Sequence, residues 1–391
     1  MVSTRVIAAP DSFKETVPAI KIVHAICESS SRLGIECDPT PMSDGGEGFA
    51  QTYVSALKEH GISYSRHPVT VSGPAGKPVE AIYYTVDPGG VPRLAIMDCA
   101  SATGLALVGG ARYNDPLAAT SRGVGELIMA AITAGIRRIL IGLGGSACTD
   151  GGLGAVEAIT TVVAAAGAGK KLNGVELIAC YDVSTAFLDA ARVFAPQKGA
   201  NTEQVNILSQ RLVDLAHYYE TDYRIDVNGL AGSGAAGGLG GGLAALGARL
   251  VPGFDVIANA VQLQERMAGA SLVITGEGRL DATSFEGKVV GRIIRAAHDQ
   301  DVPVAVIAGS VDHGLPGLKH SDVGWFSMEV PAKQPADRSA MIPAQMSANQ
   351  ICQASLQVVS LVERYGSTRA LGDTLGCVKD ATENILTGHT R

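Results

Sequence analysis

The stretch "SLVITGEGRLDATSFEGKVVGRIIRAAHDQDVPVAVIAGSVD", residues 271–312, decides the fold class. Its two apolar runs, 271–281 and 302–312, predict buried strands that end in polar or glycine-rich loops. The amphipathic segment between them, 288–300, predicts a helix. Apolar strands that alternate with helices indicate an α/β fold with a parallel sheet covered on both faces.

The same alternation occurs twice more along the chain. "RVIAA" (5–9) predicts a buried strand, and the helix expected after it has Pro18 in its first turn and Gly34 at its end. "RRILI" (137–141) predicts another strand, which is followed by a glycine-rich loop and a helix over 153–165.

Residues 69–97 have a different pattern, because polar and apolar residues alternate between Pro/Gly turns as in antiparallel strands. We therefore expect a second α/β domain, residues 66–264, inserted into a discontinuous first domain, residues 1–65 plus 265–391. The N-terminal strand and the strands after residue 270 would share one sheet. The tail after about Gly366 is polar, and it is expected to fray at its end.

Composition excludes several classes of protein. The net charge of −7 and the absence of a basic stripe argue against a nucleic-acid surface, although a local lysine cluster can still attract a small anion. The uncharged segment after Asn228 is too poor in large apolar residues for a membrane span. Seven scattered cysteines without a C-x-x-C pair predict buried thiols, no disulfide, and a cytoplasmic location.

Acidic residues recur among glycines at the predicted ends of strands. The phrases are "SDGGEG" (43–48), "GGSACTDGG" (144–152) and "TGEGRLD" (275–281), and Asp182 follows another apolar run. One such phrase is typical of a turn. Four acidic positions of this kind predict a shared site, because ligands of open α/β sheets bind beyond the carboxyl ends of the strands.

Three lysines occur in comparable loops: Lys14, Lys198 and Lys288. Each one alone is typical of a solvated surface charge. Glycine-loop amides and lysines bind phosphate oxygens, whereas carboxylates hold Mg²⁺. The combination indicates phosphoryl transfer, which depends on positioning and on neutralisation of charge.

Two glycine motifs favour another class of enzyme. "GLGGSA" (142–147) and "GSGAAG" (232–237) fit a dinucleotide fingerprint, and an NAD-dependent hydroxy-acid oxidoreductase is the alternative that they leave open. The first lacks the second strand that should end in an acid, and the second follows a poor strand. We interpret 229–247 as a nucleotide-binding loop that leads into a helix, with these candidate glycines: Gly232, Gly234, Gly237 and Gly238.

Six motifs occur in order between residues 9 and 288: "APDSFKET", "MSDGGEGF", "GLGGSACTDGG", "FAPQKGA", "GSGAAGGLGGG" and "TGEGRLDATSFEGK". This series resembles the bacterial glycerate kinase family, of the two-domain glycerate 2-kinase type. The resemblance implies one flavodoxin-like (Rossmann-like) parallel-sheet domain, one restriction-endonuclease-like mixed-sheet domain, and a cleft between them. It also implies glycerate and ATP as substrates, Mg²⁺ as cofactor and 2-phosphoglycerate as the favoured product; a kinase for another small sugar acid is the alternative.

The resemblance also suggests roles for residues. Asp182 is the candidate general base, and Lys198 and Lys14 would neutralise phosphoryl charge or clamp the substrate. Asp44 and Asp150 are the candidate metal ligands. The predicted substrate- and phosphate-binding set is Asp44, Ser146, Asp150, Glu277, Arg279, Asp281 and Lys288, in which Arg279 can pair bidentately with a carboxylate. A non-catalytic ligand-binding regulator is a third interpretation, and the oligomeric state stays open with a homodimer as one candidate.

Overall fold

The computed structural model of the protein describes residues 4–13, 17–86, 94–165, 172–322, 324–329 and 355–389. The chain divides into two compact units. Unit 1 comprises Met1–Asp44, Ser55–His60 and Ile257–Arg391, and unit 2 comprises Gly45–Val54 and Gly61–Val256. The chain leaves unit 1 directly after Asp44, within the acid-and-glycine phrase 43–48.

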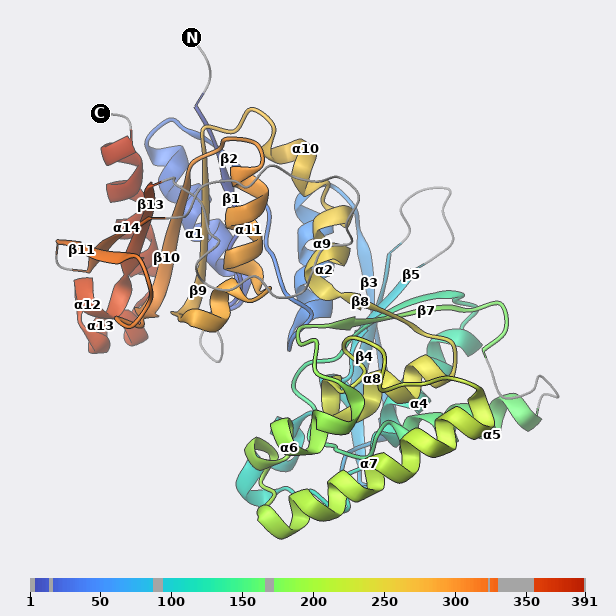
Figure 1. Ribbon diagram of the computed structural model, residues 1–391. Helices are drawn as coiled ribbons and strands as arrows, with labels where there is room; N and C mark the ends of the chain where they lie inside the picture. The colour runs from blue at the N-terminus through green and yellow to red at the C-terminus, as the bar shows by residue number, and fades with distance from the viewer. Residues whose placement is uncertain are drawn as a thin grey trace. The chain divides into compact units, whose positions relative to one another are not determined.

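Unit 1 contains a seven-stranded, mostly parallel sheet (Figure 1). Its strand order is β11 (Leu318–Asp322), β12 (Trp325–Glu329), β13 (Ser355–Ser360), β10 (Val304–Val311), β9 (Leu272–Leu280), β1 (Arg5–Ala8) and β2 (Glu36–Pro39). β1 pairs in parallel with β2 and β9, and β10 pairs in parallel with β9 and β13; β12 is antiparallel to both its neighbours. The prediction that the N-terminal strand joins the strands after residue 270 is confirmed.

Helices cover the sheet of unit 1 and make its core. They are α1 (Ala19–Arg32), α10 (Leu263–Met267), α11 (Val289–His298), α12 (Leu361–Tyr365), α13 (Ser367–Gly372) and α14 (Thr374–His389). Ile274 and Ile307 of the strands, Ile26 of α1 and Val378 of α14 belong to one buried cluster. The polar segment after Gly366 is therefore held by packing as far as α14 extends, because α14 buries an apolar stripe, and each such side chain stabilises by roughly 1.5–3 kcal/mol. The predicted fraying at the end of the tail falls on residues beyond 389, outside the described residues.

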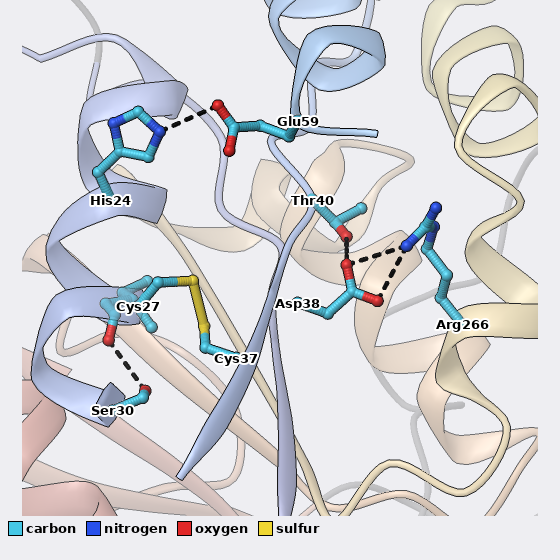
Figure 2. Close-up of a disulfide and its surroundings, with 9 residues drawn as sticks. His24, Cys27, Ser30, Cys37, Asp38, Thr40, Glu59 and Arg266 are labelled. Carbon is cyan, nitrogen blue, oxygen red and sulfur yellow. Dashed lines mark hydrogen bonds and ion pairs between the residues drawn. A yellow bond between two sulfur atoms is a disulfide. The ribbon is translucent and has the colours of Figure 1, made fainter. Parts of the chain in front are cut away.

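A disulfide joins Cys27 of α1 to Cys37 of β2, as Figure 2 shows. The prediction of seven unpaired cysteines is wrong for these two residues. Because the helix after β1 packs directly beside β2, it brings the two Cα atoms to 5.2 Å, a separation that a disulfide can bridge. The four other described cysteines, at 99, 148, 180 and 377, are buried thiols, as predicted.

Unit 2 contains a six-stranded mixed sheet. Its order is β3 (Tyr64–Ser72), β4 (Pro78–Val86), β5 (Leu94–Asp98), β6 (Arg138–Gly142), β7 (Glu176–Tyr181) and β8 (Arg249–Pro252). β3, β4 and β5 pair antiparallel, whereas β5 to β8 run parallel. This arrangement confirms the antiparallel pattern predicted over 69–97, and the two sheets together confirm the α/β fold class.

The parallel half of this sheet carries the main core of unit 2. Its helices are α2 (Phe49–Glu59), α3 (Ala100–Thr103), α4 (Arg122–Thr133), α5 (Leu153–Ala165), α6 (Ala190–Phe194), α7 (Thr202–Tyr223), α8 (Ala235–Ala245) and α9 (Gly253–Ala260), of which α2 and α9 continue into unit 1. Met97, Ile141 and Ala179 pack in one cluster with residues of α4, α5, α7 and α8. The register places Asp98, Gly142 and Cys180 side by side, so β5, β6 and β7 end along one edge of the sheet.

Candidate active site

Two predicted loops of unit 2 begin at this edge of the sheet. The loop 143–152 follows β6 and carries Ser146 and Asp150, and the segment after β7 carries Asp182. Because the strands are parallel neighbours, both loops emerge at their carboxyl ends, where α/β sheets bind ligands. The structure thus brings these two acid-bearing segments of the sequence to one place.

The acid-and-glycine loop Gly45–Gly48 lies on the same edge. A Cβ atom at Gly144 would collide with the backbone of Gly46 and Glu47, so only glycine permits this approach of two backbones. A Cβ at Gly45 would come 3.0 Å from the carbonyl oxygen of Tyr181. The loop before α2 is therefore docked on the loops that follow β6 and β7.

Asp150 holds the start of two helices together. Its Oδ2 accepts hydrogen bonds from the backbone N–H of Ser121 (2.7 Å) and from the Ser121 hydroxyl (2.8 Å) at the start of α4. Its Oδ1 accepts from the N–H of Gly152 (3.1 Å), and Oδ2 also accepts from Gly154 in the first turn of α5 (3.3 Å). A carboxylate there complements the helix dipoles, so Asp150 builds the loop 143–152.

Lys198 is buried against this loop, with 5% of its surface exposed. Its Nζ donates a 2.5 Å hydrogen bond to the carbonyl oxygen of Cys148. Asn114 donates from Nδ2 to the carbonyl oxygens of Ala147 (3.1 Å) and Lys198 (2.9 Å), which fixes the two segments to each other. Burial lowers the pKa of Lys198 to about 8. The Ser146 side chain is also buried, and its Oγ accepts from the N–H of Cys148 (3.1 Å).

The predicted nucleotide loop packs on the same two segments. Gly237 has a φ of +70°, and a Cβ there would collide with the carbonyl oxygen of Cys148. The N–H of Gly234 donates to the carbonyl of Thr185 (3.0 Å), after β7. Gly232 lies against the ring of Tyr181, and Gly238 lies against Gly151.

The loop 232–238 is followed by helix, as predicted, although residues 236–238 adopt left-handed backbone angles inside α8. Two buried hydroxyls, those of Thr149 and Ser233, have no hydrogen-bond partner. Each lies on one of the two glycine loops that pack together. A buried hydroxyl without a partner is costly, which makes these two groups candidates for binding a ligand.

Unit 1 has its own set of acidic residues at a switch point of its sheet. From β1 the chain passes through α1 to β2, and from β9 it passes through α11 to β10 on the other side of β1. Such a reversal is where open α/β sheets bind ligands. Asp11 and Asp44 are buried in the segments that follow β1 and β2, and Glu277 is buried in the second half of β9. The N–H of Asp11 donates to the carbonyl of Gly276 (2.9 Å), which places Asp11 beside the end of β9.

The remaining predicted residues of unit 1 form a partly exposed ionic group. The Arg279 Nε lies 3.8 Å from Asp281 Oδ2, and 69% of the Arg279 side chain is exposed. Asp281 accepts from the N–H (2.9 Å) and hydroxyl (2.6 Å) of Thr283, to which Lys288 Nζ also donates (2.5 Å). Burial alone would raise the pKa of Asp281, but the hydrogen bonds from Thr283 and the charges of Lys288 and Arg279 lower it.

The predicted site residues thus fall into two groups. Unit 2 holds Ser146, Asp150, Asp182, Lys198 and the four glycines, whereas unit 1 holds Asp44, Glu277, Arg279, Asp281 and Lys288. Lys14 lies outside the described residues. Among the residues that the structure describes, no three His, Cys, Asp or Glu side chains gather as a metal-binding group.

Sequence reasoning missed Asp11, Asp98 and Asn114. The two acids had a usable signal, because Asp98 ends the apolar run "LAIMD" and Asp11 follows "RVIAAP". Asn114 had none, because it lies in an irregular segment whose contacts depend on the fold. A search of the described helices for one long and apolar enough to cross a membrane finds none.

The glycerate kinase family model matches residues 6–363. The chain is 36% identical over 349 residues to the glycerate kinase of Bacillus subtilis strain 168, covering 80% of this chain and 89% of the relative. It is 35% identical over 344 residues to the glycerate 2-kinase of Escherichia coli K12, covering 81% and 87%. A crystal structure from Salmonella typhimurium LT2, assigned as glycerate kinase 2, matches with a TM-score of 0.73 and 29% identity over 99% of this chain and 98% of that one. The chain therefore belongs to the glycerate kinase family and is a kinase.

Proposed function

We propose that this kinase transfers the γ-phosphoryl group of ATP to a hydroxyl of glycerate and that 2-phosphoglycerate is the product. Family membership supports the reaction class. The observation that carries the proposal is the buried Lys198, held by Cys148 beside the packed glycine loops of unit 2. Phosphoryl transfer needs this combination of a cation and closely approached backbone, because it depends on positioning and charge neutralisation.

The residues of unit 2 fit a nucleotide's phosphates. The loops 143–152 and 232–238 approach each other closely through glycine backbone. Glycine-rich loops of this kind are a common way to bind phosphate oxygens. The hydroxyls of Thr149 and Ser233 are buried and unpartnered, and they can donate to the same oxygens. Lys198 supplies positive charge. Lys14, by its motif, would add a second cation.

Magnesium would be held mainly by ATP and by one carboxylate, because Mg²⁺ keeps several waters and needs few protein ligands. Of the two predicted ligands, Asp150 has both oxygens occupied by hydrogen bonds from Ser121 and the start of α5. We propose Asp44, which is buried at 5% exposure in the segment after β2, as the carboxylate that would hold the ion. The bound ion would neutralise charge on the phosphates.

Asp182 is the proposed general base, which accepts the proton of the attacking glycerate hydroxyl. It directly follows Tyr181, the last residue of β7, which packs on both Gly45 and Gly232. Arg279 is the proposed partner of the glycerate carboxylate, because a guanidinium pairs with a carboxylate through two parallel hydrogen bonds. Glu277, Asp281 and Lys288 would orient that arginine and the substrate.

The decisive assay follows ADP release with MgATP and a panel of small hydroxy acids, and identifies the product by phosphorus NMR. We expect ADP release with glycerate and not with lactate or glycolate. Another sugar acid as the preferred substrate would change the assignment of the substrate only. Reduction of NAD by glycerate without ATP would instead support the oxidoreductase alternative.

The role of Asp182 has its own test. Asp182→Asn should lower kcat on the order of 10² to 10⁴-fold and leave ATP affinity within about threefold, because a general base acts on the chemical step. Asp189→Asn is a matched control, since Asp189 is an exposed acid of the same segment paired with Arg192. Unchanged turnover in Asp182→Asn would remove the base assignment.

A further inference from the structure

Asp98 makes a contact with α2 that the proposed mechanism does not use. Its Oδ1 accepts a 3.0 Å hydrogen bond from the N–H of Ala50, the second residue of α2. The first N–H groups of a helix have no partner inside the helix, and the helix dipole favours a negative charge there. Asp98 comes from the end of β5, 48 residues away in sequence, so this cap is a tertiary contact.

The cap lies at the end of the Gly45–Gly48 loop. Within the loop and the first turn, the N–H of Phe49 donates to Gly46 (3.2 Å) and that of Thr52 donates to Gly48 (3.0 Å). The orientation of the loop is therefore coupled to the start of α2. On its other side the loop lies against Gly144 and the carbonyl of Tyr181, as described above.

The neighbour of Asp98 on β6 leaves room for the carboxylate. A Cβ at Gly142 would come 2.7 Å from Asp98 Oδ1 and 2.9 Å from the Cβ of Phe49. The absence of a side chain at Gly142 thus lets the carboxylate reach α2 across the end of β6. The start of α2 and the edge of the sheet are joined at this point.

The surroundings of Asp98 disfavour its ionised form. Burial raises the pKa of Asp98 to about 7; the N–H of Ala50 opposes this shift and the carboxylate of Glu47 adds to it. The thiols of Cys99 and Cys180 and the phenol of Tyr84 are its other titratable neighbours. Stability alone does not account for an acid at this position, because burial of a neutral side chain costs less free energy than burial of a carboxylate.

We infer that Asp98 is a positioning residue: through the N–H of Ala50 it anchors the Gly45–Gly48 loop against the loop 143–152, in the arrangement that phosphoryl transfer requires. Asp98 acts through the loop and does not touch the substrate. The inference rests on the proposed function, since that function gives the arrangement its use.

The test compares two variants of the full chain. Asp98→Ala removes the acceptor, whereas Asp98→Asn keeps an Oδ1 that can accept from Ala50. Hydrogen–deuterium exchange of a peptide spanning 45–52 reports the loop, and steady-state kinetics with MgATP and glycerate report function. Asp98→Leu is a second acceptor-free variant that leaves no cavity. Ser101→Ala is the control, because it removes a nearby hydrogen bond, from Ile82 N–H (2.6 Å), that does not involve α2.

We expect amide exchange over 45–52 to rise at least tenfold in Asp98→Ala and Asp98→Leu, and kcat per folded enzyme to fall at least tenfold. Asp98→Asn should return both quantities to within about threefold of the wild type, and Ser101→Ala should leave both unchanged. If the acceptor-free variants keep wild-type exchange and kcat, the inference is overturned and Asp98 is only part of the core. If the wild type releases no ADP with glycerate, the proposed function fails, and the exchange data still decide whether Asp98 anchors the loop.

Discussion

Replacement of Asp98 by Asn should stabilise the protein at alkaline pH, and the gain should disappear on acidification. Burial raises the pKa of Asp98 from its ordinary value of 3.8 to about 7. This difference corresponds to about 4 kcal/mol of unfolding free energy, at about 1.4 kcal/mol for each tenfold change in proton affinity. Because the folded state binds the proton more tightly than the unfolded chain, the carboxyl is harmless below pH 4. Its cost then grows as the pH rises to about 7.

The measurement is urea denaturation followed by circular dichroism between pH 5 and 9. Asp98→Asn should exceed the wild type by up to about 4 kcal/mol above pH 7.5, and the difference should shrink by about 1.4 kcal/mol for each pH unit below 7. Glu80→Gln controls for the loss of one negative charge, since Glu80 is 64% exposed on β4 and its pair with Arg66 contributes less than about 1 kcal/mol. A stability difference that stays constant from pH 5 to 9 would refute the reasoning, because Asp98 would then ionise at the same pH in the folded and unfolded states.

Three further outcomes are expected. Cys27→Ser should lower the free energy of unfolding by about 3 kcal/mol, because the disulfide closes a loop between residues ten apart and so restricts the unfolded chain. Dithiothreitol should lower the free energy of unfolding of the wild type by the same amount. An effect of dithiothreitol on the stability of Cys27→Ser would contradict this prediction. The free energy of unfolding of the wild type, measured relative to Lys198→Met, should rise by up to about 3 kcal/mol between pH 8 and 10.5. The reason is that the folded state disfavours the charged form of Lys198, and this penalty disappears as the lysine loses its proton. Urea titrations at pH 7, 9 and 10.5 check this. Gly237→Ala should weaken ATP binding at least tenfold by calorimetry, because its Cβ would collide with Cys148, and unchanged affinity would remove this loop from the nucleotide site.

The fold class could be predicted from sequence because its signals are local. The apolar runs of 271–281 and 302–312 became β9 and β10, with α11 between them. The alternation over 69–97 became antiparallel strands because one-sided burial forces a period of two. The acid-and-glycine loops of unit 2 met at one edge for a topological reason, since parallel neighbours end on the same side.

Other features could not be predicted, because they depend on which elements become neighbours. The Cys27–Cys37 disulfide follows from the packing of α1 beside β2, and a spacing of ten residues does not reveal it. Helix α14 was missed because its buried residues include small ones such as Cys377 and Ala381, so that its overall composition remains polar. The hydrogen bonds of Asp150 to Ser121 and to the start of α5 could not be predicted either, because they depend on which helices begin beside its loop.

The costs of burial distinguish acids and bases that build the fold from those that serve chemistry. Asp150 is surrounded by donors that offset its charge, as expected of a residue that stabilises a loop. Asp98 and Lys198 are both held where their charged forms are disfavoured, and their pKa values are moved to about 7 and about 8. A protein selected for stability alone would replace both by neutral residues, since a well-packed apolar side chain costs less than a buried charge. Their occurrence beside the loops 45–48 and 143–152 is therefore an argument for function that is independent of family membership.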